Sequence, residues 1–323
     1  MLPHAPRAKQ DPHAVPERSD FEADVLAGFA ATPKRIPPKY FYDTEGSRLF
    51  EAITRQPEYY PTRTETGILK AKARELAGIV PANPALIEFG SGACTKVRIL
   101  CDAVPGLAAF VPVDISGPFL NQHAAELGKA YPRLAIHPVA ADFTKPFSLP
   151  PAVRDLSKTG FFPGSTIGNF EPEEAAAFLR LVRDVLGAHA FLVVGVDLVK
   201  DEATLDVAYN DAAGITAKFN LNLLRRINRE LQGGFDLGAF RHRAFFNSAR
   251  SRIEMHLVSA KEQTVAVAGR SFSFAAGESI HTENSYKYSL DSFAALARHS
   301  GWAAHAAWTD PDRLFSVHVL RAV

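Results

Sequence analysis

The stretch Ala85-Leu86-Ile87-Glu88-Phe89-Gly90-Ser91-Gly92-Ala93-Cys94-Thr95-Lys96 decides the fold of this chain. A run that is apolar apart from one acid leads into two glycines one residue apart, and Val97, Ile99 and Leu100 follow at helical spacing. The pattern predicts a strand, a tight glycine loop and the start of a helix. Such a loop lets the backbone approach a ligand closely, and the N–H groups of the helix point toward that ligand. In an open α/β sheet, a nucleotide-like cofactor binds at this place.

Strands and helices alternate along the chain around this loop. Besides 85–89, apolar runs predict strands at residues 109–113, 134–139, 159–162 and 190–196. Helical spacing fits between them at residues 95–103, 118–130 and 173–186. Continuous apolar strands separated by helices predict an α/β fold with a doubly wound, mostly parallel sheet that is covered on both faces.

The pattern changes after Asp197. Residues 202–231 are largely helical, residues 252–258, 264–267 and 271–274 alternate with period two, and residues 289–300 and 315–319 predict a last helix and strand. Before the glycine loop, helices are expected at residues 20–31, 46–53 and 64–77. We therefore predict a cofactor-binding domain of residues 63–199 and 287–323, and a second α+β domain of residues 21–62 and 200–286. Residues 1–20 are polar and proline-rich and indicate a flexible tail rather than a signal peptide.

The composition excludes several classes of protein. The 36 basic and 35 acidic residues leave a net charge of +1, so there is no electrostatic signature of nucleic-acid or membrane binding. No apolar run is long enough for a transmembrane helix. The two cysteines, Cys94 and Cys101, form no CxxC pair, and the 11 histidines show no metal-ligand spacing. We expect a cytoplasmic, monomeric protein with reduced thiols and no metal.

Acids at or just after strand ends point to an adenosine-containing cofactor. Asp114 follows the second strand, where it can accept hydrogen bonds from ribose hydroxyls, and Asp142 follows the third, where it can accept from an adenine amino group. Glu88 lies at the end of the first strand. A dinucleotide site usually has a third glycine, which is absent after Gly90 and Gly92, so S-adenosylmethionine fits better than NAD. The alternative is that the glycines only form a turn and the acids only cap helices.

Six runs of sequence, in this order, resemble one family. They are Pro37-Pro38-Lys39-Tyr40-Phe41-Tyr42-Asp43, Pro57-Glu58-Tyr59-Tyr60-Pro61-Thr62-Arg63, Gly164-Ser165-Thr166-Ile167-Gly168-Asn169, Asp197-Leu198-Val199-Lys200-Asp201, Tyr209-Asn210-Asp211-Ala212-Ala213-Gly214 and Thr282-Glu283-Asn284-Ser285-Tyr286-Lys287. They are similar to the ergothioneine-pathway L-histidine Nα-methyltransferases, which use S-adenosylmethionine to convert histidine to trimethylhistidine (hercynine). The resemblance covers nearly the whole chain after the tail, and it implies a Rossmann-like class I methyltransferase core with a second, substrate-binding domain.

The resemblance also implies a role for individual residues. The residues that match cofactor positions are Gly90, Lys96, Asp114, Asp142 and Phe143, to which the loop pattern adds Gly92. On the substrate side, Asn169 and Tyr209 match a pair that holds the carboxylate, and Glu283 and Ser285 match the pair that reads the imidazole. Tyr59 matches an imidazole contact, Met255 a residue beside the substrate side chain, and Tyr42 a residue near the reacting amine.

Ordinary structural roles compete with these assignments. Without the resemblance, Tyr59, Tyr209 and Met255 would be read as packing residues, Asn169 as a turn residue and Glu283 as a solvated acid. Other functions also stay open: the same chemistry on another amino acid or an indole-type amine, a nicotinamide-dependent oxidoreductase, a nucleic-acid methyltransferase, or a binding protein without activity. The near-neutral charge argues against nucleic acid, and the missing third glycine argues against a nicotinamide cofactor.

Overall fold

A large, mostly parallel sheet forms one half of the molecule. The computed structural model describes residues 18–104 and 106–323, so most of the predicted tail lies outside the described residues. The strands of the large sheet run in the order β13-β14-β7-β6-β2-β3-β4, with β5 also paired to β3. Their bounds are β2 Ala85–Phe89, β3 Ala109–Asp114, β4 Ala135–Ile136, β5 Val139–Ala140, β6 Lys158–Phe162, β7 Phe191–Asp197, β13 Trp302–Thr309 and β14 Phe315–Ala322. All neighbours from β4 to β7 are parallel, whereas β14 is antiparallel to both β7 and β13.

Helices cover both faces of this sheet because its strands are apolar on both sides. All five residues of β2 are buried, and its neighbouring residues Leu86 and Ile87 belong to opposite cores. One core includes side chains of α3 (Tyr60–Ile79), α4 (Val97–Ala103) and α5 (Gly117–Ala130). The other includes side chains of α6 (Pro172–Leu186) and α9 (Leu290–His299). The predicted doubly wound α/β fold is confirmed.

The strand order reverses between β2 and β6, and this reversal locates the ligand site. To one side of the reversal lie β3 and β4, and to the other lies β7. Loops that follow neighbouring strands diverge at such a point and leave room for a ligand at the carboxyl edge of the sheet. The glycine loop follows β2, and the short helix η3 (Thr166–Asn169) follows β6.

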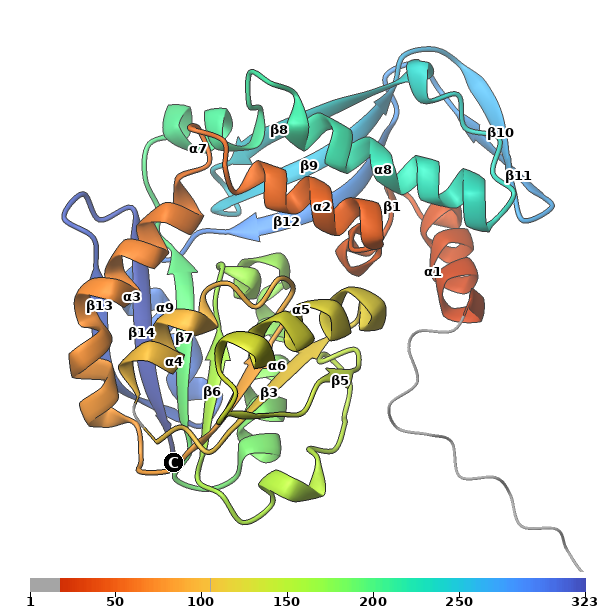
Figure 1. The fold of residues 1–323 in the computed structure, drawn as a ribbon. Coiled ribbons are helices and arrows are strands. Elements are labelled where there is room, and N and C mark those ends of the chain that lie inside the picture. Colours follow the sequence, from red (N-terminus) through yellow and green to blue (C-terminus); the bar gives the residue numbers. More distant parts are fainter. Residues whose placement is uncertain (1–17, 105) are drawn as a thin grey trace, which may run out of the picture.

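A second, α+β unit lies over the carboxyl edge of the large sheet (Figure 1). Its four strands are ordered β1-β12-β9-β8 and enclose a separate core with α1, α2 and α8. The bounds are β1 Lys34–Arg35, β8 Phe240–Asn247, β9 Arg252–Ser259, β12 Ser279–Tyr286, α1 Arg18–Ala30, η1 Pro38–Phe41, α2 Thr44–Ile53, α7 Glu202–Tyr209, α8 Ile215–Glu230 and η4 Leu237–Ala239. A hairpin of β10 (Gln263–Val267) and β11 (Arg270–Phe274) extends from it, and the helix η2 (Pro151–Val153) lies in the connection before β6.

Most predicted elements are confirmed, and one is wrong. The expected strand at 134–139 is two short strands, β4 and β5, interrupted at His137 and Pro138. Proline has no N–H to donate to a neighbouring strand, which accounts for a break there. The strands β8, β12 and β13 were not predicted, and β14 runs antiparallel in a sheet that was expected to be mostly parallel. The proposed domain boundaries stay a prediction. Within the described residues, no helix combines the length and apolarity needed to cross a membrane.

Candidate active site

The glycine loop is held open by the carboxylate of Asp114. Gly90 and Gly92 have φ values of 71° and 48°, a backbone conformation that residues other than glycine rarely adopt. Asp114 Oδ2 accepts a hydrogen bond from the Gly92 N–H at 3.0 Å, and Oδ1 accepts from the Ser116 N–H at 2.9 Å. The carboxylate therefore joins the ends of β2 and β3, although burial raises its pKa. One acid thus shapes the loop and stays beside it as an acceptor.

The side chain of Glu88 supports the glycine loop through a hydrogen bond with a residue of the loop. Its side chain is buried and accepts a hydrogen bond from the Ser91 hydroxyl, and burial raises its pKa to about 8. Cys94 is also buried, and burial raises the pKa of its thiol to about 12. A thiol with so little thiolate at neutral pH is unreactive. Both side chains are structural.

Asp142 presents an acceptor that has no hydrogen-bond partner. Its Oδ1 accepts from the Thr144 N–H at 3.0 Å, whereas Oδ2 is buried and accepts no hydrogen bond from residues 18–104 or 106–323. The ammonium of Lys39 lies 3.8 Å from Oδ2. Next to it, the ring of Phe143 lies 3.4 Å from where a Cβ on Gly90 would sit. An orphaned acceptor, an aromatic ring and a glycine backbone fit the amino group and the faces of an adenine.

Lys96 is paired with a buried acid that the sequence analysis missed. Its ammonium forms an ion pair with Glu65 of α3, whose side chain is fully buried. Both Glu65 oxygens also accept from the Gly164 N–H at 2.9 Å. A Cβ on Gly195 would lie 1.9 Å from Glu65 Oε1, so only glycine leaves room there. Glu65 shares the buried face of α3 with Pro61, Ile68 and Leu69, and this helical spacing could have revealed it from the sequence.

Tyr42, Tyr59 and Tyr209 form an aromatic cluster together with Phe50. The ring centroids of Tyr42 and Phe50 are 5.8 Å apart, those of Phe50 and Tyr59 6.4 Å, and those of Tyr59 and Tyr209 6.3 Å. Burial raises the pKa of each tyrosine well above its usual value of about 10. For Tyr42, the carboxylates of Glu283 and Asp114 raise the pKa further. All three phenols are protonated at neutral pH.

Glu283, Ser285 and Met255 share one face of the small sheet. Glu283 pairs with Met255 across β12 and β9, and Ser285 pairs with Ile253, so these side chains project on the same side. Burial raises the pKa of Glu283 to about 8, and the ammonium of Lys287 opposes that rise. Within the described part of the chain, no group donates a hydrogen bond to the Glu283 carboxylate. The oxygens of Glu283 are therefore free to accept a hydrogen bond from a ligand.

Asn169 is carried by η3, which is clamped between the two units. A Cβ on Gly168 would lie 2.7 Å from the carbonyl oxygen of Tyr286, so η3 lies directly against β12. On the other side, Ser165 Oγ accepts from the Asp197 N–H at 2.9 Å. Among the residues with described positions, none is hydrogen-bonded to the side chain of Asn169. These contacts fix the backbone of η3, and the side-chain amide of Asn169 remains available to a ligand.

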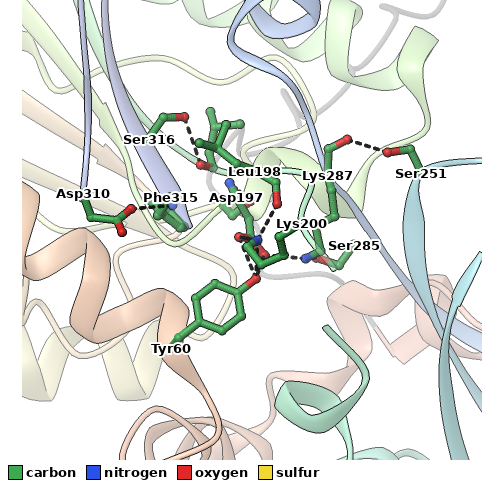
Figure 2. Close-up of polar contacts among 12 residues, drawn as sticks. Tyr60, Asp197, Leu198, Lys200, Ser251, Ser285, Lys287, Asp310, Phe315 and Ser316 are labelled. Atoms are coloured by element: carbon green, nitrogen blue, oxygen red, sulfur yellow. Dashed lines mark hydrogen bonds and ion pairs between the residues drawn. The ribbon is translucent and has the colours of Figure 1, made fainter. Parts of the chain in front are cut away.

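Tyr209 and Ser285 meet a buried lysine that the sequence analysis did not single out. The Tyr209 and Ser285 hydroxyls lie 2.7 Å apart, and Lys287 Nζ donates to both. Asp197 forms ion pairs with Lys287 and Lys200 and accepts a hydrogen bond from the Tyr60 hydroxyl (Figure 2). Buried lysines are rare unless paired, and Lys287 ends the same motif that contains Glu283.

The structure brings most of the predicted site residues together. Tyr42, Tyr59, Tyr209, Glu283, Ser285 and Met255 belong to one contiguous cluster, and Gly90, Gly92, Asp114, Asp142 and Phe143 belong to another. Tyr42 is near both, and Asn169 lies on the segment that joins the units. What each of these residues binds stays a prediction.

A separate cluster of potential metal ligands lies on the other face of the small sheet. Ligand atoms of Glu254, His256 and His281 are within 4.8 Å of one another. Arg252 already binds the Glu254 carboxylate at 2.7 Å, and the two imidazole rings are stacked with an interplanar angle of 22°. Stacked rings direct their nitrogens side by side rather than toward one point. This arrangement is accounted for by hydrogen bonding and stacking.

Comparisons with known proteins agree with the geometry. Residues 21–322 match a family described as histidine-specific methyltransferase, SAM-dependent. The chain is 44% identical over 293 residues to the histidine N-alpha-methyltransferase of Mycolicibacterium smegmatis, covering 89% of this chain and 90% of that protein. It is 42% identical over 292 residues to the same enzyme of Mycobacterium tuberculosis, with the same coverage. It is also 29% identical over 308 residues to ergothioneine biosynthesis protein 1 of Neurospora crassa, of which it covers 33%.

Proposed function

Because this chain belongs to the histidine-specific, S-adenosylmethionine-dependent methyltransferases, we propose that it trimethylates the α-amine of L-histidine to hercynine, in ergothioneine biosynthesis. The observation that supports this substrate most directly is the free carboxylate of Glu283 beside the Ser285 hydroxyl. An imidazole has one N–H donor and one nitrogen acceptor, which a carboxylate and a hydroxyl complement. A site built around such hydrogen bonds rejects analogues that lack them.

The cofactor is assigned to the loops after β2, β3 and β5. Asp114 would accept from the ribose hydroxyls, Asp142 Oδ2 from the adenine amino group, and Phe143 would lie against the adenine ring. Gly90 and Gly92 allow the backbone to approach, and Lys96 brings a cation to the same place. When bound, S-adenosylmethionine supplies an electrophilic sulfonium methyl group.

Two sets of groups would hold the substrate. Asn169 and Tyr209 would bind the carboxylate, and Glu283 and Ser285 the imidazole, with Tyr59 and Met255 beside the ring. Holding the amine at the correct distance and angle is the main task of the protein in a direct displacement. Because Glu283 and Met255 are both present, histidine is favoured over an indole-type amine, whose ring has no second nitrogen for Ser285.

Tyr42 is assigned to orientation rather than to proton abstraction. Its pKa is raised above that of an ordinary phenol, so it is a weak proton acceptor at neutral pH. The substrate ammonium is protonated at neutral pH and must lose its proton to water before each transfer. Tyr42 and Phe50 can then stabilise the methylated cation through cation–π contact. We propose that the reaction needs no metal ion, since the methyl group is already activated.

The direct test is mass spectrometry of the purified protein with S-adenosylmethionine and each amino acid in turn. We expect histidine alone to gain one, two and three methyl groups. Methylation of tryptophan with histidine unchanged would contradict the proposed substrate. Absence of any transfer, together with no binding of S-adenosylhomocysteine, would contradict the proposed activity.

A further inference from the structure

The buried ammonium of Lys287 forms an ion pair with Asp197 and donates hydrogen bonds to two hydroxyls. Its Nζ lies 2.7 Å from Asp197 Oδ2, 2.8 Å from Ser285 Oγ and 3.1 Å from the Tyr209 hydroxyl. The side chain is fully buried. Burying a charge costs free energy unless the charge is paired and hydrogen-bonded. The presence of a buried lysine with this set of partners therefore needs a physical reason.

The proton count on the two hydroxyls gives that reason. A hydroxyl has one proton to donate and two lone pairs. Lys287 occupies a lone pair on Tyr209 and one on Ser285, and the 2.7 Å bond between these hydroxyls uses one proton. One proton is then free for a ligand. If a ligand opens the bond between the hydroxyls, both protons face the ligand while Lys287 still satisfies each oxygen.

Asp197 keeps the ammonium in place. Its carboxylate accepts from Lys287 and Lys200, each at 2.7 Å, and from the Tyr60 hydroxyl at 2.8 Å (Figure 2). These groups come from β7, from the end of β12, and from α3, so the network joins both units.

We propose that Lys287 is a positioning residue for the substrate, which turns Tyr209 and Ser285 into hydrogen-bond donors and places a positive charge behind the carboxylate site. The inference rests on the proposed function, and it adds a residue that touches the substrate only through others. Lys287 also lies close enough to Glu283 to favour the ionised carboxyl that accepts the imidazole N–H. The Lys287 ammonium thereby acts on three proposed substrate contacts, namely the Tyr209 and Ser285 hydroxyls and the Glu283 carboxyl.

The test compares two buried lysines that bind the same aspartate. Lys287→Met removes the donor to both hydroxyls, whereas Lys200→Met removes a partner of Asp197, of Tyr60 and of the Leu198 carbonyl and leaves both hydroxyls their donor. Calorimetry measures histidine binding in the presence of S-adenosylhomocysteine, and S-adenosylhomocysteine binding alone reports on the fold. We expect Lys287→Met to weaken histidine binding roughly tenfold to 100-fold, since hydrogen bonds from a charged donor are strong. Lys200→Met should change it by about twofold.

A double-mutant cycle separates positioning from a merely structural role. In a Tyr209→Phe/Ser285→Ala background the hydroxyls are gone, so adding Lys287→Met should weaken histidine binding clearly less than it does in the wild type. The effect that remains is that of the Lys287 charge, including its action on Glu283. Lys287→Gln, which keeps an amide donor, should give an intermediate affinity and serves as the test if the methionine variant does not bind S-adenosylhomocysteine.

Three results would overturn the inference. Equal effects of the two lysine variants would do so, and so would an undiminished Lys287→Met effect in the background without hydroxyls. In both cases wild-type binding of histidine would leave the proposed function intact. A wild type that binds S-adenosylhomocysteine but not histidine would overturn the proposed function and this inference together.

Discussion

At the scale of single residues, the candidate site contains polar groups that form no hydrogen bond with the residues that the structure describes. Asp142 Oδ2 is buried and accepts no hydrogen bond from the described residues, although the Lys39 ammonium lies 3.8 Å away. The side chains of Glu283 and Asn169 also form no hydrogen bond with the described residues. Buried or half-buried acceptors of this kind are unfavourable until a ligand supplies donors. Their distribution, one beside the glycine loop and two near the small sheet, is the one expected if the proposed cofactor and substrate bind there.

Glu283→Ala should weaken histidine binding by about 2 kcal/mol, because the imidazole N–H loses a charged acceptor. The affinity for S-adenosylhomocysteine should stay the same, since Glu283 lies on the small sheet. Calorimetry with each ligand measures both constants. Glu278→Ala is the matched control, because this acid lies just before β12 and pairs with Lys34 instead. Equal losses for both ligands would contradict the role assigned to Glu283.

Asp114→Ala should give the opposite selectivity. It removes the acceptor proposed for the ribose and releases the Gly92 N–H that shapes the loop. We expect S-adenosylhomocysteine binding to weaken by about 2 kcal/mol or more. The control is Asp184→Ala, which removes an exposed acid on α6. An unchanged affinity in the Asp114 variant would contradict the ribose assignment.

The affinity for the trimethylated product should rise with pH from about 7 to 9. The pKa of Glu283 is about 8, and below that pH the carboxyl is protonated and offers the imidazole N–H only a neutral oxygen, which is a weaker acceptor than the carboxylate. Binding is therefore expected to weaken by up to about tenfold per pH unit below the pKa. The product suits this measurement because its quaternary amine does not titrate.

Glu283→Gln is the control for this pH dependence. Lys200, whose pKa burial lowers to about 8, titrates in both proteins, so the difference between their profiles isolates Glu283. A profile in the glutamine variant as steep as that of the wild type would assign the pH dependence to another group.

At the scale of elements, the residues behind the cofactor site were predictable and those behind the substrate site were less so. The run from Ala85 to Phe89 is apolar and ends in glycines, so its strand and loop follow from local chemistry. β12 is Ser-Ile-His-Thr-Glu-Asn-Ser-Tyr, in which residues of low strand propensity alternate with a few that favour strands. Its pairing with β9 and β1 is a tertiary effect that no local pattern encodes.

The positions of Glu283 and Ser285 could accordingly be inferred only from resemblance. The register that sets Glu283 opposite Met255 depends on an irregularity between His281 and Glu283. A shift of one residue would turn both side chains to the other face of the sheet. β13 was missed for a similar reason, because its sequence Trp-Ala-Ala-His-Ala-Ala-Trp-Thr is rich in alanine, which disfavours strands.

Gly168→Ala tests how closely η3 must approach β12. The added methyl group would lie 2.7 Å from the Tyr286 carbonyl oxygen, so η3 and Asn169 must move. We expect KM for histidine to rise roughly tenfold, as for loss of a substrate hydrogen bond. Gly67→Ala is the control, because its methyl group meets nothing within 4 Å on α3 and should stabilise the helix slightly. An unchanged KM in the Gly168 variant would show that the approach is not needed.

At the scale of the whole molecule, one acid at the start of α6 contacts three residues of the small sheet. Glu171 Oε1 accepts from Arg252 at 2.7 Å and from Asn284 at 3.1 Å, and Oε2 accepts from the Tyr286 hydroxyl at 2.5 Å. These contacts fix the small sheet relative to the cofactor sheet. Holding two ligands at reacting distance depends on that relation.

Glu171→Ala should loosen the relation between the units without disrupting either core. The Glu171 side chain is 41% exposed, so we expect only about 1 kcal/mol lower stability, measured by thermal unfolding. The rate of methyl transfer should fall more than the affinity for S-adenosylhomocysteine. Glu174→Ala, on the same first turn of α6, controls for helix capping. Proportional losses in rate and cofactor affinity would contradict a positioning role.

The chain leaves the large sheet at the end of β7 and returns to it beside the same point. The Tyr288 N–H donates to the Asp197 carbonyl at 3.1 Å, and the Val199 N–H donates to the Tyr288 carbonyl at 3.0 Å. The segment between Asp197 and Tyr288 therefore begins and ends at the same point of the large sheet. Such a segment resembles a cassette, because it can be exchanged as one block without changing the order of the strands in that sheet. New amine specificities would then be sought by replacing this cassette as a block, with the segment before β2 redesigned to match.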